Sequence, residues 1–260
     1  MRILHYCLIL VLLSIPCVIP GQSSFAEIND KAIAAYQQKD YGGAMREWKR
    51  LRAEGNADPD LSYNIGLAES LSGNLPEALL NFEKAIRYKP ADTNLQKAIQ
   101  QERNKIENAV IAVKPFFLVE WYKVWLAMLS PRMWALSALL LILIAVVQWL
   151  IQLGIIKAKQ PAFSVNIWIP VTMGMLCLIF SILSYREIYR VNEGIIFSEC
   201  PLQAGASIQS PQTRTLYQGE KIKVTDEISG WYKVKLLNLD EGWLKKECVK
   251  LIDVNEVTND

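Results

Sequence analysis

Two long stretches of the chain are free of charged residues and rich in Leu, Ile, Val and Met. They cover residues 133–156 and 160–185. Each is longer than the roughly 20 apolar residues that a helix needs to cross the hydrocarbon core of a bilayer. Trp and Tyr occur towards the ends of both stretches, where amphipathic rings prefer the membrane–water interface. The pattern therefore predicts a hairpin of two transmembrane helices with a short cytoplasmic loop between them, at 133–156, 162–185 and 157–161.

Three amide side chains interrupt this apolar hairpin. Gln148 and Gln152 are four residues apart on one face of the first helix, and Asn166 falls at a depth between them on the second. Pro170 has no N–H group, which leaves the carbonyl of Asn166 without its helical partner. We expect an amide contact between the helices, worth about 0.6 to 2 kcal/mol. The alternative is that the amides reach the interface or another subunit.

The N-terminus has the pattern of a secretory signal peptide, 1–26. A single charge, Arg2, precedes an apolar run, and the small residues Ser24 and Ala26 suit a cut before Glu27. An uncleaved anchor is the alternative. A translocated N-terminus places both polar parts of the chain outside the cytoplasm. The positive-inside rule supports this orientation only weakly, because basic residues near the outer ends outnumber the two lysines of the loop.

A short aromatic segment, 115–130, precedes the first span. Large apolar side chains alternate there with two charges, Glu120 and Lys123. Such a segment is typical of an amphipathic helix that lies in the membrane interface. We expect it to anchor the protein, and a partner-binding site is the alternative.

The polar N-terminal part, 27–110, contains an internal repeat. Four positions recur 34 residues later, as Tyr41, Ala44, Trp48 and Leu51 followed by Leu75, Ala78, Phe82 and Ala85. With Gly66 and Pro90, this pattern resembles the tetratricopeptide repeat, a helix pair in which small residues let the helices touch. The resemblance implies an array that binds other proteins on the concave face of its first helices. The candidate residues on that face are Asn29, Ile33, Tyr36, Tyr63, Leu67 and Ser70.

Short alternating strands are predicted in the C-terminal part, 190–253, which a tail at 254–260 follows. Two Gly-Trp pairs, ending at Trp231 and Trp243, are each followed by alternating apolar residues. This signature resembles a bacterial SH3-like (SH3b) domain. A barrel of this size has a small core, so we expect both tryptophans to be structural. The resemblance implies binding of cell-wall peptides or proteins, for which Tyr217 and Tyr232 are the candidates.

Two cysteines, Cys200 and Cys248, fall near the first and last strands of this predicted barrel. Those strands run close together in an SH3-like fold, and an extracytoplasmic location permits a disulfide. A disulfide and a pair of unbonded, half-buried thiols remain equal alternatives.

The composition supports a membrane protein and excludes several chemistries. Hydrophobic residues make up 52% and charged residues 21% of the chain, against about 45 to 50% and about 25% in soluble proteins. The net charge is +2, with mixed signs in both polar parts, so nucleic acid is not an expected partner. The only histidine, His5, lies in the predicted signal, which excludes Ser-His or Cys-His catalysis and His-containing zinc sites. We expect no enzyme activity, metal or cofactor.

The sequence thus predicts a multidomain membrane protein: all-α tetratricopeptide-like repeats, a transmembrane hairpin and a small all-β SH3-like barrel. This order of modules resembles the BatE-type proteins of bacterial aerotolerance (Bat) operons. The resemblance implies a periplasmic scaffold in the inner membrane, with von Willebrand factor A membrane proteins and a MoxR-type AAA ATPase as partners. The alternative is a membrane anchor that binds peptidoglycan and recruits a wall enzyme.

Overall fold

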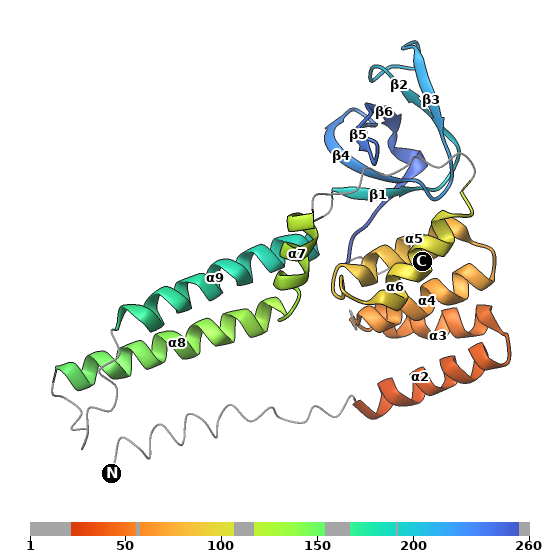
Figure 1. Cartoon of the computed structure of the whole chain (residues 1–260). Coiled ribbons are helices and arrows are strands. Elements are labelled where there is room, and N and C mark those ends of the chain that lie inside the picture. The colour runs from red at the N-terminus through yellow and green to blue at the C-terminus, as the bar shows by residue number, and fades with distance from the viewer. Residues whose placement is uncertain (1–21, 56–57, 107–116, 154–166, 191, 255–260) are drawn as a thin grey trace.

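The computed structural model in Figure 1 describes residues 22–55, 58–106, 117–153, 167–190 and 192–254. It contains a helical domain, a hairpin of two long helices and a small β-barrel. The hairpin extends to one side of the molecule, and the helical domain and the barrel lie together on the other side (Figure 1).

The helical domain consists of two helix pairs and a fifth helix. Its elements are α2 (Gln22–Gln37), α3 (Tyr41–Ala53), α4 (Pro59–Leu71), α5 (Leu75–Ile86) and α6 (Thr93–Arg103). Asp40 begins α3 by accepting a hydrogen bond from the Gly43 nitrogen, at 2.8 Å, and Asp92 begins α6 in the same way. These short polar caps fix the turns between helices, so each helix folds back on the one before it.

Close helix contact in the second pair requires a glycine. A Cβ atom on Gly66 would lie 2.6 Å from the ring of Phe82, which is itself buried. The aromatic ring therefore occupies the space that a side chain on α4 would need. The first pair is filled in a similar way by Trp48 and Leu51, with Ala32 fully buried against them.

The predicted signal cleavage falls inside α2. Residues 1–21 lie outside the described part, but Phe25 packs against the core of the first helix pair. A cut before Glu27 would remove this ring and place the buried residue Ile28 second in the cleaved chain.

The hairpin is formed by α8 (Pro131–Gln152) and α9 (Trp168–Tyr189), and both helices are long and apolar enough to cross a membrane. α8 begins two residues before the predicted span, and α9 ends four residues after it. Small side chains line the contact: a Cβ on Gly174 would lie 3.5 Å from the carbonyl oxygen of Ala138. Buried α9 positions are three, four or seven residues apart, the spacing of one helix face: Pro170, Gly174, Cys177, Ser184 and Ile188.

The three amides of the hairpin have different surroundings. Gln148 is buried at the helix contact, and its Oε1 atom has no hydrogen-bond partner among the described residues. Gln152 is exposed, so the two glutamines do not share one environment. Asn166 lies outside the described residues, and its pairing with Gln148 stays a prediction.

A short helix, α7 (Phe117–Leu126), crosses the end of the hairpin (Figure 1). The Trp134 side chain donates a hydrogen bond to the Leu126 carbonyl at 3.2 Å, and Lys123 forms an ion pair with Glu187 of α9 at 3.4 Å. Most of its apolar side chains are exposed, including Trp121 at 60%. These features suit a helix at the level of the membrane interface.

The barrel is one antiparallel sheet. Its core contains Leu202, Leu216 and Leu244, which are at most 1% exposed. A short 3-10 helix, η1 (Lys246–Cys248), precedes the last strand. The strands are β1 (Glu193–Ile196), β2 (Cys200–Gln203), β3 (Gln212–Leu216), β4 (Lys221–Ile228), β5 (Trp231–Leu236), β6 (Glu241–Lys245) and β7 (Val249–Leu251). Their order in the sheet is β3-β2-β6-β5-β4-β1-β7.

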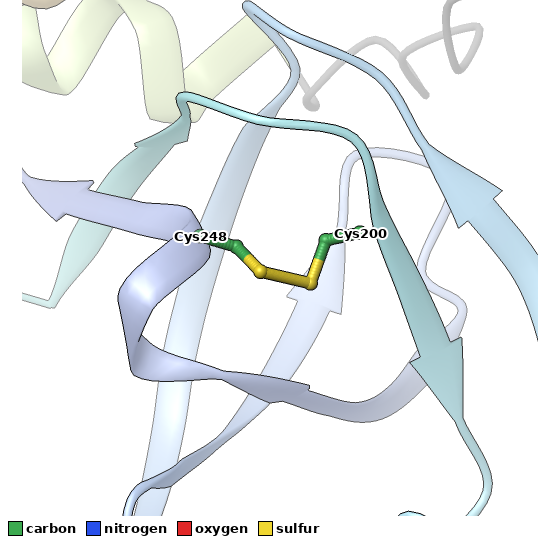
Figure 2. The surroundings of a disulfide bond; sticks show 2 residues. All are labelled: Cys200 and Cys248. Atoms are coloured by element: carbon green, nitrogen blue, oxygen red, sulfur yellow. A yellow bond between two sulfur atoms is a disulfide. The ribbon is translucent and has the colours of Figure 1, made fainter.

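A disulfide joins Cys200, at the start of β2, to Cys248 in η1 (Figure 2). The two Cα atoms are 6.2 Å apart, within the usual range for this bond. Of the two alternatives that the sequence leaves open, the structure therefore has the bonded pair. The bond holds η1 and the following β7 against the barrel.

Candidate interaction surfaces and the domain junction

The polar residues expected on the concave face of the helical domain form contacts within the domain. The side-chain amide oxygen of Asn29 accepts a hydrogen bond from the Trp48 side chain at 3.0 Å. The Ser70 hydroxyl donates to Glu102 of α6 at 2.6 Å. Both groups therefore stabilise the array and offer little to a partner.

The apolar candidates divide between core and surface. Leu67 and Tyr63 pack against the core of the second pair, and the Tyr63 ring lies 5.8 Å from that of Phe82. Tyr36 is half-buried, and burial, with smaller effects of neighbouring tyrosines including Tyr63, raises the pKa of its hydroxyl. Ile33 is 37% exposed. The structure thus leaves Ile33 and the edges of Tyr36 and Tyr63 available on this face.

The helical domain and the barrel share one hydrophobic core. Ile195 of β1 and Ile252, just after β7, are buried among residues of α5 and α6, including Leu79 and Phe82. The turn before β4 also reaches the helices: a Cβ on Gly219 would lie 2.9 to 3.1 Å from three of their apolar side chains. The barrel therefore covers apolar surface that the helices would otherwise expose.

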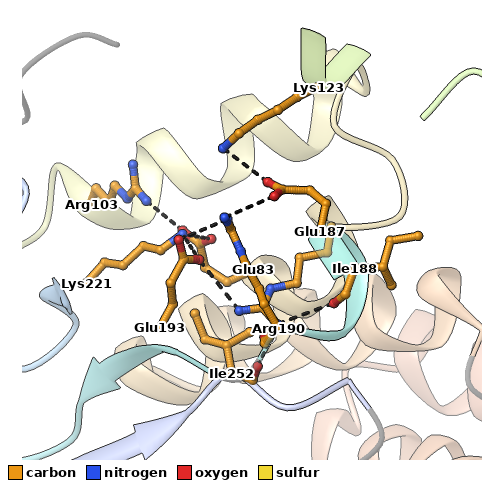
Figure 3. A network of polar contacts seen from close by, with 10 residues as sticks. Glu83, Arg103, Lys123, Glu187, Ile188, Arg190, Glu193, Lys221 and Ile252 are labelled. Carbon is orange, nitrogen blue, oxygen red and sulfur yellow. Dashed lines mark hydrogen bonds and ion pairs between the residues drawn. The ribbon is translucent and has the colours of Figure 1, made fainter. Parts of the chain in front are cut away.

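A buried network of charges lies beside this apolar contact (Figure 3). Glu83 of α5 is 3% exposed and contacts Lys221 of β4 at 2.8 Å and Arg103 of α6 at 2.6 Å. Lys221 also contacts Glu193 of β1 at 2.9 Å. The network therefore connects two helices of the helical domain with two strands of the barrel.

Arg87, at the end of α5, joins all three parts of the protein. Its guanidinium donates hydrogen bonds to the backbone carbonyls of Ile252, at 2.8 Å, and Ile188, at 3.4 Å, and to that of Arg190. It also lies 3.6 Å from the Glu193 carboxylate. One buried side chain of the helical domain thus holds the end of α9 and the last segment of the barrel.

Ion pairs continue from this network to the outer end of the hairpin. Arg190 contacts Glu193 at 2.9 Å and Glu187 at 3.2 Å, and Glu187 in turn contacts Lys123 of α7. Lys123 and Arg190, two of the basic residues near the outer ends of the hairpin, therefore both have acidic partners. Only residues 190–192 separate α9 from β1 along the chain.

The pKa values of the buried acids reflect these partners. Burial acts to raise the pKa of Glu193, but Lys221 and Arg190 outweigh it and lower the value to about 2, from an ordinary 4.5. Burial opposes Lys221 and Arg103 in the same way at Glu83, whose pKa is also lowered. Both carboxylates are therefore charged at neutral pH, and the junction is an assembly of ion pairs.

Two charged residues are the sequence feature that indicates this junction, although hydrophobic periodicity alone does not explain them. Glu83 and Arg87 are four residues apart on α5, on the side that also carries the buried residues Leu79 and Leu80. Charges on the apolar side of a helix require partners. The sequence does not reveal that those partners lie more than 100 residues away, at Glu193 and Lys221.

The barrel candidates are placed differently from expectation. Tyr232 packs against the barrel core, with the Lys246 ammonium 5.1 Å from its ring centroid, and Tyr217 is half-buried. Trp231 and Trp243 are not in that core. The pairing of β5 with β6 places them opposite Lys245 and Lys233, on the outer face of the sheet.

The comparisons with known proteins concern this barrel. Residues 202–250 match the bacterial SH3 domain family. No curated protein matches the chain. The match and the curled antiparallel sheet agree. The C-terminal region is therefore an SH3-like domain similar to bacterial SH3 domains, which bind peptidoglycan or proteins, in a chain that also has two helices of membrane-spanning length.

Proposed function

We propose that this protein is a non-enzymatic scaffold of the bacterial inner membrane. Its hairpin crosses the membrane, and its helical domain and SH3-like barrel lie in the periplasm and bind other proteins. The proposal also treats the helical domain as tetratricopeptide repeats. The helix pairs and the glycine contact between Gly66 and Phe82 support that interpretation.

The buried junction is the observation that carries this proposal. Because Arg87, Glu83 and Glu193 connect the helical domain, the barrel and the end of α9, the two modules keep one orientation relative to the hairpin. A fixed arrangement of two binding modules suits a scaffold, which must present several surfaces to its partners at once.

The disulfide supports the periplasmic location of both modules. Disulfides form and persist in oxidising compartments such as the periplasm and are rare in the bacterial cytoplasm. The bond between Cys200 and Cys248 lies in the barrel, and the barrel shares its side of the hairpin with the helical domain. The two modules therefore belong to the same compartment.

The proposed partners are those of a Bat-type complex, namely membrane proteins with von Willebrand factor A domains and a MoxR-type AAA ATPase in the cytoplasm. The test is purification of the tagged full-length protein from its own cells in mild detergent, followed by mass spectrometry. Recovery of von Willebrand A proteins supports the proposal. Their absence, together with recovery of wall enzymes, contradicts it.

The match to bacterial SH3 domains favours one second function, a membrane anchor that binds peptidoglycan. The full-length protein in nanodiscs is the right sample, because an isolated barrel would expose Ile195 and Ile252. Co-sedimentation with purified cell-wall sacculi tests it. Retention that free muropeptides compete away favours the anchor, whereas no retention leaves the scaffold.

A further inference from the structure

One face of the barrel combines lysines with tryptophans, and neither tryptophan belongs to the barrel core. Strand pairing aligns Lys223 with Lys235, Lys233 with Trp243, and Trp231 with Lys245. Ile228, opposite Trp231, is 48% exposed. We call this surface the lysine–tryptophan face; its members are Lys223, Ile228, Trp231, Lys233, Lys235, Trp243 and Lys245.

The strand alternation shows that these side chains point outward. Val234 and Leu244 are fully buried, so their neighbours along β5 and β6 lie on the opposite side of the sheet. The pairing of β4 with β5 shifts register between Val224 and Asp226, as at a β-bulge, and so brings Ile228 to the outer side.

The lysine–tryptophan face has a net positive charge. Lys233 and Lys235 both contact the single carboxylate of Glu241, at 3.6 and 3.7 Å. Lys223 and Lys245 are exposed, and neither forms an ion pair with any carboxylate of the described residues. Asp226 and Glu193 are the strand partners of Lys233 and Lys223, so four positive charges face three negative ones. Glu193 also contacts Lys221 and Arg190, each at 2.9 Å. The remaining positive charge favours an anionic ligand.

This face begins close to the point where the chain leaves the hairpin. Tyr189 ends α9, and Glu193 is four residues further on, at most about 13 Å away in extended chain. Lys223 of β4 lies opposite Glu193 of β1 in the strand register, and Lys235 of β5 lies opposite Lys223. In Figure 1, β4 lies on the side of the barrel nearest to α7 and α9, whereas β2 and β3 lie on the far side.

We propose that the lysine–tryptophan face rests on the membrane surface and binds the phosphate groups of anionic phospholipids. The inference depends on the proposed insertion of the hairpin. Lysines near a membrane are attracted to anionic lipid, and tryptophan prefers the headgroup region. The exposed apolar side chains of α7 already place an interfacial surface at this end of the hairpin, and the face extends it onto the barrel.

Fluorescence quenching in nanodiscs tests this contact with the full-length protein. A fluorophore on Ile228→Cys reports on the lysine–tryptophan face, and one on Ile208→Cys reports on the β2–β3 loop at the far side. The membrane carries a headgroup spin label in phosphatidylcholine, with or without phosphatidylglycerol. We expect the label at 228 to be quenched about twofold or more in the anionic membrane relative to the neutral one, and the label at 208 to show no such change.

Charge reversal provides the matched comparison. Lys223→Glu with Lys245→Glu removes the extra quenching, while Lys39→Glu with Lys97→Glu, an equal charge change at exposed positions of the helical domain, leaves it intact. Higher salt weakens the signal as the charges are screened.

Two results would overturn the proposal. One is equal quenching at 228 in neutral and anionic membranes. The other is binding of a poly-glutamate peptide to the same lysines without lipid quenching, which would assign the face to an acidic protein segment. Because only protein that co-elutes with nanodiscs is measured, insertion of the hairpin is established separately from the lipid contact.

Discussion

Replacing Arg87 with methionine tests whether one buried guanidinium holds the three parts of the protein together. Methionine keeps most of the packing volume of the arginine stem but removes the charge and the donors. The Glu193 carboxylate retains Lys221 and Arg190, each at 2.9 Å, and is not left unpaired. The loss therefore falls on the backbone carbonyls of Ile188, Arg190 and Ile252.

The magnitude follows from those hydrogen bonds. Hydrogen bonds to a charged donor contribute about 1.5 to 3 kcal/mol each, and the three carbonyls share one nitrogen, so we count about two full bonds. Two such bonds give about 3 to 6 kcal/mol, and removing one partner from a buried ionic network costs about 3 to 5 kcal/mol. The expected cost is therefore about 3 to 5 kcal/mol, the range in which the two figures agree. The matched control is Arg50→Met, whose ion pair with Glu54 is at the surface and contributes less than about 1 kcal/mol.

Hydrogen exchange measured by mass spectrometry in nanodiscs reads this loss locally. The Ile252 amide donates to the Glu193 carbonyl at 2.8 Å, so peptides covering β7 report on the junction. We expect their opening free energy to fall by about 3 to 5 kcal/mol in Arg87→Met, while peptides from α3 keep theirs. An effect no larger than that of Arg50→Met, or an equal loss in α3, would refute the reasoning.

Three further predictions concern the junction and the barrel. In denaturant unfolding, Gly219→Ala should destabilise the protein more than Gly230→Ala. Both glycines have a φ of +87°, but only at position 219 would the new Cβ meet other side chains. That overlap adds about 1 to 3 kcal/mol to the cost. Reduction of the disulfide between Cys200 and Cys248, which are 48 residues apart, should cost the barrel about 4 kcal/mol, and intact mass before and after alkylation verifies the bond. Because the pKa of Glu193 is lowered in the folded protein, the unfolded chain binds the proton more tightly. The stability that this carboxylate contributes is therefore complete above about pH 4.5 and falls as the pH decreases towards about 2. Unfolding midpoints measured at about pH 6 and about pH 3 give the difference.

The hairpin and the helix pairs could be predicted because their signals are local. An uncharged run of sufficient length predicts a membrane helix wherever it lies in the fold. The resemblance to the tetratricopeptide repeat, which Gly66 and Phe82 help to carry, implies a close helix pair. At its outer end α9 continues past the predicted span through Arg186 and Glu187, because a charged residue ends an apolar span but does not end a helix. Glu187 forms its ion pair with Lys123 of α7.

The outward orientation of the barrel tryptophans can be obtained from the alternation of the sequence. Alternation along β5 already separates Trp231 from Val234 and Leu236, which are buried. The expectation that both tryptophans are structural came from the small core of such a domain and did not specify a side of the sheet. The bulge after Val224 could not be anticipated, because a one-residue shift in register has no signature in the hydrophobic pattern.

The sequence by itself determined which elements form and where the apolar surface of each one lies, since those properties follow from hydrophobic period and from capping residues. Only the tertiary structure decided that Arg87 and Glu83 meet Glu193 and Lys221, and that Ile195 and Ile252 complete the core of another domain. Ionic and apolar contacts between distant segments depend on how elements pack, and a charge on a buried helix face shows only that a partner is needed. That dependence is the physical reason why the three modules could be predicted separately and their junction could not.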